Sequence, residues 1–415
     1  MTPQIKQRIE QIRRGEVPEG YKKTKIGVVP CEWEETRFKK MFSKLSRKNK
    51  ENNDNVLTIS AQYGLISQRD FFNKDISSED KSNYFLLHTG EFAYNKSYSN
   101  GYPFGALKRL DMYDKGIVSP LYICFYANED NKCPDFYAHY FEAGMMNREI
   151  QAFAQEGARN HGLLNISVDD FFNSYLLMPP LAEQEKIAEI LQTQDKVIEL
   201  QQKKIDELKR LKKVYLSKMF PKKGCNVPEI RFPEFTDPWE QRKAKDLCSI
   251  STGKSNTQDR VDDGIYPFYV RSPIVEHSNR YLFDEEAVLT VGDGVGTGKV
   301  FHYVNGKYDL HQRVYRMFDF TEEITAKYFY YYFSNHFYDR VMAMTAKTSV
   351  DSVRYEMIAD MEISLPKIQE QRAISDYFEN LDNLITLHQR KCEEQKKYKK
   401  ALMQILLTGI VRVTL

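Results

Sequence analysis

The feature that most constrains this 415-residue chain is an internal repeat. Segment 179–184 (Pro-Pro-Leu-Ala-Glu-Gln) aligns with segment 366–371 (Pro-Lys-Ile-Gln-Glu-Gln), and the alignment continues without a gap to residues 220 and 407. The paired identities include Glu183/Glu370, Asp195/Asp382, Glu207/Glu394 and Lys212/Lys399. Two equal copies of one segment indicate a duplicated structural unit.

Each copy has the apolar spacing of one long helix. Apolar residues recur at alternating intervals of three and four, which is typical of a coiled coil of about five heptads. Pro221 and Gly409 are expected to stop the two helices. Because a large domain must return the chain between the copies, we predict an antiparallel pair. The predicted seam residues are Ile187, Leu191, Ile198, Ile205, Leu208, Ile374, Phe378, Leu381, Ile385 and Leu402.

A second repeated element precedes each helix. The two tryptophans, Trp33 and Trp239, each follow a proline-containing approach and open a variable region. Strand-like runs alternate there with helical segments, which predicts a mixed α/β class and a pseudo-two-fold internal repeat. The predicted order is an N-terminal helical segment (1–20), a first variable domain (21–178), a first long helix (179–221), a second variable domain (222–365), a second long helix (366–409) and a C-terminal tail (410–415).

The charge distribution suggests a partner that carries phosphates. The 60 basic and 58 acidic residues nearly cancel, but basic residues predominate in 37–50, 203–223 and 390–400. No apolar run approaches the ~20 residues of a membrane helix, and the first residues lack the apolar stretch of a secretory signal. The six cysteines form no C-x-x-C pair. We therefore expect a cytoplasmic protein without structural zinc.

The glycine-rich segment Gly292–Lys299 is the nearest approach to a catalytic motif. It fails as a Walker A loop because Asp293 occupies the first glycine position and Val300 replaces the Mg-binding Ser/Thr. A tight turn is the favoured interpretation, and an approach of Lys299 to a DNA phosphate is a further one. No nucleophile has a recognisable context and the histidines form no metal cluster, so the sequence contains no complete catalytic motif.

The loops of both variable regions carry side chains suited to reading bases. Arg and Lys can bond guanine, and Asn and Gln can bond adenine. For any one residue, a hydrogen bond within its own domain remains the alternative, and we expect about half of the set to touch DNA. The candidates are Tyr94, Asn95, Lys96, Tyr98, Asn100, Arg159, Asn160, His161, Arg271, Ser272, Lys299, His311, Gln312, Arg313, Lys347, Thr348 and Ser349.

This organisation resembles the specificity subunits of Type I restriction–modification systems over essentially the whole chain. The most specific motifs are the helix start at 179–187 (Pro-Pro-Leu-Ala-Glu-Gln-Glu-Lys-Ile) and its second copy at 366–374. The tryptophan entries and the closing Leu-Leu-Thr-Gly at 406–409 add to the resemblance. The second copy departs from the pattern at Lys367, Ile368 and Arg372.

The resemblance implies that the chain is not an enzyme but the non-catalytic, DNA-binding component of a host-defence complex. Each variable domain would be a target recognition domain for one half of a split, asymmetric site in double-stranded DNA. The helices would act as a ruler, with ~35 residues spanning ~52 Å or roughly 15 base pairs. They would also dock two methylation subunits that use S-adenosylmethionine for DNA methylation. A motor–nuclease subunit would use ATP and Mg²⁺, and this chain itself would bind no cofactor or metal.

Two other classes of function remain open from the residues alone. One is a coiled-coil scaffold that binds protein, against which a steep fall of DNA affinity with salt would count. The other is a nucleotide-binding enzyme that uses the Gly292–Lys299 loop, which retained ATP or S-adenosylmethionine binding by the isolated chain would favour. Neither explains two diverged domains on one duplicated scaffold.

Overall fold

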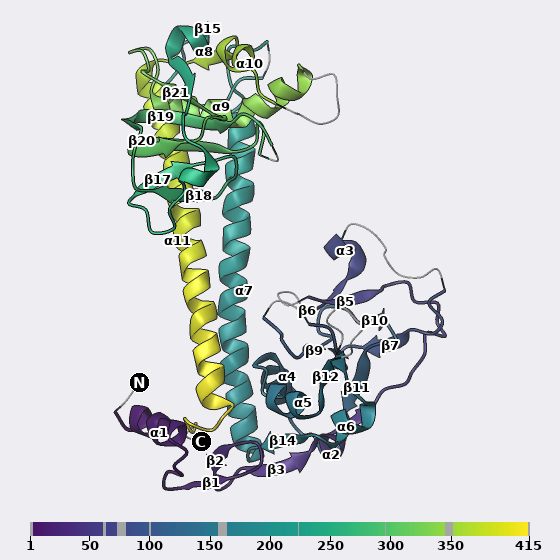
Figure 1. Cartoon of the computed structure of the whole chain (residues 1–415). Helices are drawn as coiled ribbons and strands as arrows, with labels where there is room; N and C mark the ends of the chain where they lie inside the picture. The colour runs from purple at the N-terminus through teal and green to yellow at the C-terminus, as the bar shows by residue number, and fades with distance from the viewer. Residues whose placement is uncertain are drawn as a thin grey trace. The chain divides into compact units, whose positions relative to one another are not determined.

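The computed structural model describes residues 3–60, 64–72, 80–98, 101–156, 164–222, 224–294, 296–344 and 352–413 (Figure 1). The chain divides into two compact units, of which the first comprises Met1–Leu200 with Cys392–Leu415 and the second Gln201–Lys391. The long helices α7 (Leu181–Lys218) and α11 (Ile368–Leu406) each contribute to both units. No helix of the described residues is both long and apolar enough to cross a membrane.

The first unit contains a four-stranded sheet in the order β4-β11-β8-β9, with antiparallel pairing throughout. Its strands are β4 (Phe42–Lys44), β11 (Ile123–Ala127), β8 (Phe92–Asn95) and β9 (Ala106–Arg109). Strand pairs surround the sheet: β1 (Tyr21–Lys23) with β2 (Val28–Pro30), β3 (Glu34–Arg37) with β14 (Tyr175–Met178), β5 (Leu57–Ser60) with β6 (Gly64–Ser67), β7 (Phe85–His88) with β10 (Lys115–Val118), and β12 (Gln155–Glu156) with β13 (Leu164–Asn165). The short helices are α1 (Pro3–Arg13), α2 (Phe38–Met41), α3 (Gln68–Phe72), α4 (Pro134–Glu142), α5 (Asn147–Phe153) and α6 (Val168–Asn173).

The core of the first unit is rich in aromatic residues and extends onto the long helices. The rings of Phe38 and Phe125 meet edge to face at 5.0 Å, which is a favoured geometry for buried aromatic pairs. Ile187 and Leu191 of α7 and Leu406 of α11 belong to the same buried cluster. The helix ends are therefore part of the domain core in this unit.

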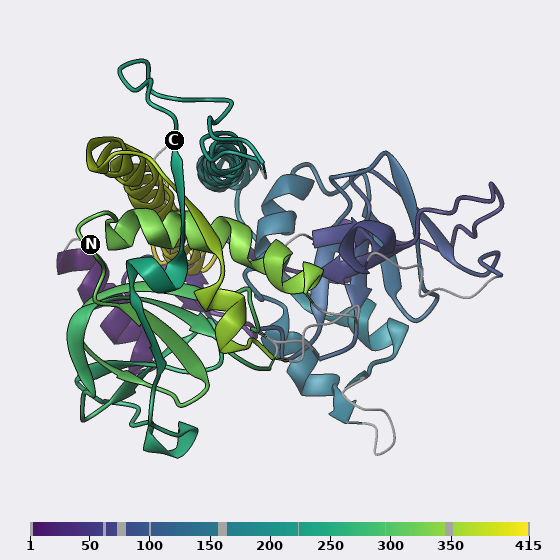
Figure 2. The same ribbon diagram turned by 90° about the horizontal axis from the view of Figure 1, so that it is seen from above.

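The second unit is built on a six-stranded sheet in the order β16-β21-β19-β20-β17-β18. These strands are β16 (Ser249–Thr252), β21 (Val314–Phe318), β19 (Phe283–Val291), β20 (Phe301–Leu310), β17 (Tyr266–Tyr269) and β18 (Val275–Ser278), and only the β17/β20 pairing is parallel among them. The separate pair is β15 (Glu240–Lys243) with β22 (Glu362–Leu365), and the helical elements are α8 (Ala244–Leu247), η1 (Thr257–Asp259), α9 (Ala326–Ala343) and α10 (Tyr355–Ala359). Figure 2 shows α9 lying along the sheet of this unit.

Helix α9 links the sheet of the second unit to the long helices. Thr325 caps its N-terminus by accepting a hydrogen bond from the backbone N–H of Tyr328. Buried side chains of α9 such as Phe333 share one cluster with Val288 and Met317 of the sheet and with Phe378 of α11. The prediction of a mixed α/β fold with sheet-containing domains is confirmed.

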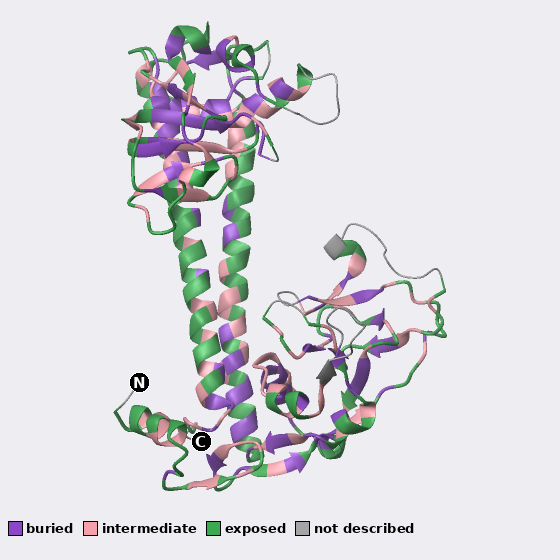
Figure 3. Cartoon of the chain, in the orientation of Figure 1, coloured by how far each residue is buried: buried purple, intermediate pink, exposed green. Residues whose placement is uncertain are grey.

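The paired segments of α7 and α11 are antiparallel in each unit, as predicted. In the first unit, the Gln194 amide Nε2 donates to Gln395 Oε1 at 2.7 Å, and Lys399 pairs with Asp195. In the second unit, Lys212 Nζ donates to Asp382 Oδ1 at 2.5 Å. The predicted seam residues are buried, except that Ile198 and Leu402 are half-buried, and exposed residues separate them along both helices (Figure 3).

These polar pairs display the internal repeat in the structure. The Asp195/Lys399 pair of the first unit and the Lys212/Asp382 pair of the second unit are the same two repeat positions with their roles exchanged. His388 Nδ1 lies 2.9 Å from Oε1 of Gln201, its own repeat equivalent. Equivalent residues of the two helix copies therefore make equivalent polar contacts within each unit.

Candidate nucleic-acid interface

Three predicted residues of the second unit lie around a fourth one, His311. Strand pairing brings their loops together: Val291 at the end of β19 pairs with Val314 at the start of β21, so the following Asp293 lies beside Arg313. Arg271 Nη1 lies 3.5 Å from Asp293 Oδ1, and Arg313 Nε lies 3.8 Å from Asp293 Oδ2. We call Arg271, Asp293, His311, Gln312 and Arg313 the His311 cluster.

His311 itself supports the loop rather than facing solvent. Its side chain is buried, and Nδ1 accepts a hydrogen bond from the backbone N–H of Arg313 at 3.0 Å. Burial, together with the nearby charge of Arg271, lowers the pKa of His311 below its usual value, so the neutral imidazole is favoured. The predicted base contact of His311 stays a prediction; in this structure its exposed neighbours Gln312 and Arg313 are the more accessible side chains.

The two arginines of the cluster are the accessible cations. The side chains of Arg271 and Arg313 are 49% and 66% exposed, whereas that of Asp293 is 26% exposed. Gln312 is also exposed, and its amide Nε2 donates to Asn256 Oδ1 at 2.5 Å. Ser272 donates from Oγ to the Ile274 carbonyl at 3.2 Å, a contact that stabilises its own turn.

The Gly292–Lys299 loop is a closed turn. The backbone N–H of Thr297 donates to Gly294 O at 3.1 Å, and the N–H of Lys299 donates to Gly296 O at 3.0 Å. Amides already bonded within a turn are not available to cradle a phosphate, so the geometry favours the tight-turn interpretation. Lys299 is exposed, with Nζ 4.7 Å from the ring centroid of Tyr338.

Arg280 is a further cation that the sequence analysis did not select. Its Nη2 donates to Asp259 Oδ2 at 2.8 Å and to Ser255 Oγ at 3.0 Å. Asp309, which is fully buried, accepts from Ser255 Oγ at 2.5 Å. The polar run Ser278-Asn279-Arg280 resembles the segments that were selected, so its composition could have indicated it.

The predicted residues of the first unit have mixed environments. Tyr94 is fully buried, donates from its hydroxyl to Phe104 O at 2.7 Å, and has a pKa raised by burial. Strand β8 buries this side chain in the core, so its predicted base contact stays a prediction that the burial does not favour. Asn95 accepts from the Ser97 N–H at 3.1 Å, the Lys96 carbonyl accepts from the Leu164 N–H at 3.0 Å, and Tyr98 is 63% exposed.

Seven predicted residues lie outside the described residues. They are Asn100, Arg159, Asn160, His161, Lys347, Thr348 and Ser349. In the described part of the chain, no group of three or more His, Cys, Asp or Glu residues could hold a metal ion.

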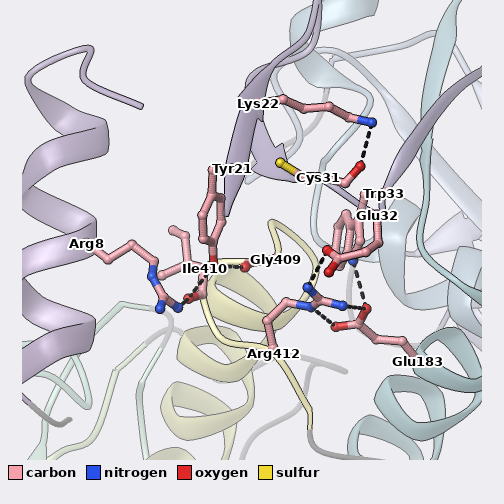
Figure 4. A network of polar contacts seen from close by, with 10 residues as sticks. All are labelled: Arg8, Tyr21, Lys22, Cys31, Glu32, Trp33, Glu183, Gly409, Ile410 and Arg412. Carbon is pink, nitrogen blue, oxygen red and sulfur yellow. Dashed lines mark hydrogen bonds and ion pairs between the residues drawn. The ribbon is translucent and has the colours of Figure 1, made fainter. Parts of the chain in front are cut away.

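A buried ionic network anchors the first unit to its helices (Figure 4). Glu183 at the start of α7 accepts from Arg412 Nε at 2.7 Å, from Arg412 Nη2 at 2.9 Å and from Trp33 Nε1 at 2.9 Å. Tyr21 and Arg8 bond the carbonyls of Gly409 and Ile410 in the same region. The segment after α11 is thus fixed to the first tryptophan entry.

The second unit repeats this arrangement with a different arginine. Glu370, the repeat equivalent of Glu183, accepts from Arg231 Nε at 2.7 Å and from Nη2 at 2.8 Å. Trp239 is buried nearby, but its Nε1 has no hydrogen-bond partner among the described residues. The internal repeat identifies both glutamates in the sequence, but it does not indicate which arginines pair with them.

Comparison with known proteins shows matches that span both units. A family model described as Type I restriction modification DNA specificity domain matches residues 30–210 and 236–396. The Type I restriction enzyme MjaVIII specificity subunit of Methanocaldococcus jannaschii is 28% identical over 291 residues, which cover 63% of this chain and 68% of that protein. The putative type I restriction enzyme MjaX specificity subunit of the same organism is 22% identical over 428 residues, covering 95% and 97%.

A solved structure has a similar fold. The crystal structure of a Type I restriction–modification S subunit from M. genitalium matches with a TM-score of 0.58 at 12% identity, covering 92% of this chain and 97% of that chain. At this identity the likeness concerns the fold alone. Each segment matched by the family model contains one tryptophan entry and most of one helix copy.

Proposed function

The chain belongs to the Type I restriction–modification DNA specificity family and is the non-catalytic specificity subunit of such a complex, and on that premise we propose that each unit reads one half of a split DNA site. The supporting observation is the His311 cluster, which presents two exposed arginines from loops of a rigid sheet. Because the loops of the two units differ in sequence, the two half-sites should also differ. Approximate two-fold symmetry would place them on opposite strands.

Within each unit, phosphates and bases would be contacted by different groups. Lysines such as the exposed Lys299 and the half-buried Lys96 supply salt-dependent affinity for the DNA backbone. Arg271, Gln312 and Arg313 in the second unit, with Asn95 and Tyr98 in the first, are the described candidates for base contacts. The neutral His311 and the buried Tyr94 would support the loop and the core of their units rather than contact DNA.

The long helices would set the unread gap between the half-sites. Helix α7 has 38 residues and α11 has 39, which corresponds to about 57 Å of helix at 1.5 Å per residue. Fixed polar pairs such as Gln194/Gln395 hold the register of the two helices. A ruler requires such a fixed register.

Shortening both helices by one heptad tests the ruler. Deletion of residues 193–199 and 390–396 removes facing segments, keeps the exposed Leu200 and Leu387, and leaves Gln201 opposite His388. The gap should shorten by about 3 base pairs, because seven residues span about 10 Å of helix. The methylated motif is read by sequencing DNA modified by the reconstituted complex, with a shuffled spacer library as substrate. An unchanged gap would contradict the ruler.

The helices would also dock two methylation subunits. Leu200 and Leu387 are repeat equivalents, and both are exposed, at 65% and 45%. Exposed apolar residues at equivalent positions indicate two equal docking sites for copies of one partner. S-adenosylmethionine would bind to those partners, and ATP and Mg²⁺ to a motor–nuclease subunit. The native mass of the reconstituted complex measures this stoichiometry, and a single methylation subunit per chain would contradict it.

A further inference from the structure

We propose that Asp293 is a positioning residue that holds Arg271 and Arg313 as a pair for reading guanine in the half-site of the second unit, an inference that rests on the proposed function of that unit. In the sequence, Asp293 is notable only because it occupies the first glycine position of a Walker A-like loop. In the structure it is the one carboxylate shared by both exposed arginines of the His311 cluster.

The backbone around Asp293 is fixed on both sides. The N–H of Gly292 donates to Arg313 O at 2.8 Å, and the Val353 N–H donates to Gly292 O at 2.7 Å. A Cβ at Gly292 would lie 2.8 Å from Arg313 O, so this close approach requires glycine. Asp293 also forms a β-bridge with Ser352. The carboxylate is therefore carried by a rigid turn, and both guanidinium groups orient toward a fixed point.

The charge of Asp293 affects the two possible DNA contacts of an arginine, a phosphate and a base edge, differently. A phosphate bound by Arg271 or Arg313 would bring a negative charge close to the Asp293 carboxylate, and the repulsion would oppose that contact. The guanine edge offers the neutral acceptors O6 and N7, so this repulsion is absent. An arginine used only as a phosphate contact gains nothing from a carboxylate at its side.

Orientation is the second reason to favour a base. Bidentate bonding to guanine requires the planar guanidinium to be aligned with the base edge, and a free arginine loses rotamer freedom to reach that alignment. Asp293 restricts both side chains before DNA arrives. The result is specificity at two positions supplied by a residue that does not itself touch a base.

The test compares Asp293→Asn with the parent chain in the reconstituted complex with methylation subunits, using a library of sites randomised in both half-sites. Asparagine keeps the size of the side chain and removes its charge. The guanine preference at one or two positions of the second half-site should fall about tenfold, while preferences in the first half-site stay unchanged. Asp262→Asn is the matched control, because Asp262 pairs with Arg260 at 2.6 Å in the same unit but is 80% exposed, and it should change nothing.

A second variant keeps the test decisive if Asp293→Asn does not fold. Arg271→Lys retains the positive charge but loses the bidentate fork, so it should lose guanine preference with little change in salt dependence. If both variants keep all base preferences, or if Asp293→Asn tightens binding to every sequence equally, the arginines contact phosphate and the inference is overturned. Failure of the proposed function looks different, because the parent complex would then show no base preference in the second half-site.

Discussion

The network around Glu183 gives a prediction whose magnitude follows from burial. Glu183 has a side-chain exposure of 2% and receives two hydrogen bonds from Arg412. Truncation by Arg412→Ala leaves this carboxylate buried with the Trp33 indole N–H as its remaining described donor. Breaking a buried pair in this way costs about 3–5 kcal/mol. Because the Arg412 side chain is 36% exposed, water partly replaces it, and we expect a loss of about 2–3 kcal/mol.

The two tryptophans make this loss measurable in one unit. Trp33 belongs to the first unit and Trp239 to the second, so the fluorescence of a Trp239→Phe chain reports unfolding around Trp33. With a urea slope of about 2 kcal/mol per M, Arg412→Ala should lower the midpoint by about 1 M. The control is Arg14→Ala, whose ion pair with Glu10 is 65% and 66% exposed and should contribute less than about 1 kcal/mol.

A double variant separates charge burial from lost packing. Glu183→Gln in the Arg412→Ala background removes the uncompensated charge and keeps an oxygen that can accept from Trp33. The double variant should therefore be more stable than Arg412→Ala alone. Equal effects of Arg412→Ala and Arg14→Ala would refute the reasoning, as would a double variant that is less stable than the single one.

Two further predictions use the same fluorescence assay. Burial, with the charge of Lys399, lowers the pKa of His139 to about 4. Between pH 4 and 6.5, His139 is therefore protonated in the unfolded chain but neutral in the folded one. The first unit should lose about 2 kcal/mol of unfolding free energy from pH 7.5 to pH 5. A His139→Gln chain with the same pH dependence would contradict this. In the second unit, a Cβ at Gly253 would lie 2.1 Å from Leu310 O, so Gly253→Ala should cost about 3 kcal/mol when followed by Trp239 in a Trp33→Phe chain. The exposed Ser251→Ala, two residues earlier in β16, is its control, and equal midpoints for the two variants would count against the close approach.

The helix pair was predictable because its determinants are local and periodic. Heptad spacing requires a seam, and the repeat supplied both partners, so the burial of residues such as Leu191 and Phe378 followed from the sequence. The polar seam pairs were not predicted: Asp195 and Lys212 recur in the second copy, but the repeat alone did not indicate that each would pair with the equivalent of the other. Local periodicity was therefore sufficient to predict most of the helix pair.

The candidate site was only partly predictable because its geometry depends on pairing between distant strands. Tyr94 was selected from a polar run, but β8 buries three consecutive residues, so alternation gave no sign of which side chain would face solvent. His311 and Arg313 are two residues apart, yet His311 is buried and Arg313 is exposed. The chain turns between them, because the His311 N–H donates to the Tyr269 carbonyl whereas the Arg313 carbonyl accepts from the Gly292 N–H. The role of Asp293 depends on β19 lying beside β21, which no local pattern specifies.

The central claim is that this chain selects a split, asymmetric DNA site through its two units. The most direct measurement is the methylome of the native host at single-molecule level, with and without the gene for this chain. We predict that methyladenine disappears at one motif made of two different half-sites separated by an unread gap, and returns when the gene is restored. If no motif is lost while the methylation subunit is produced and active with the chain present, or if the lost motif is a single uninterrupted site, the account is contradicted.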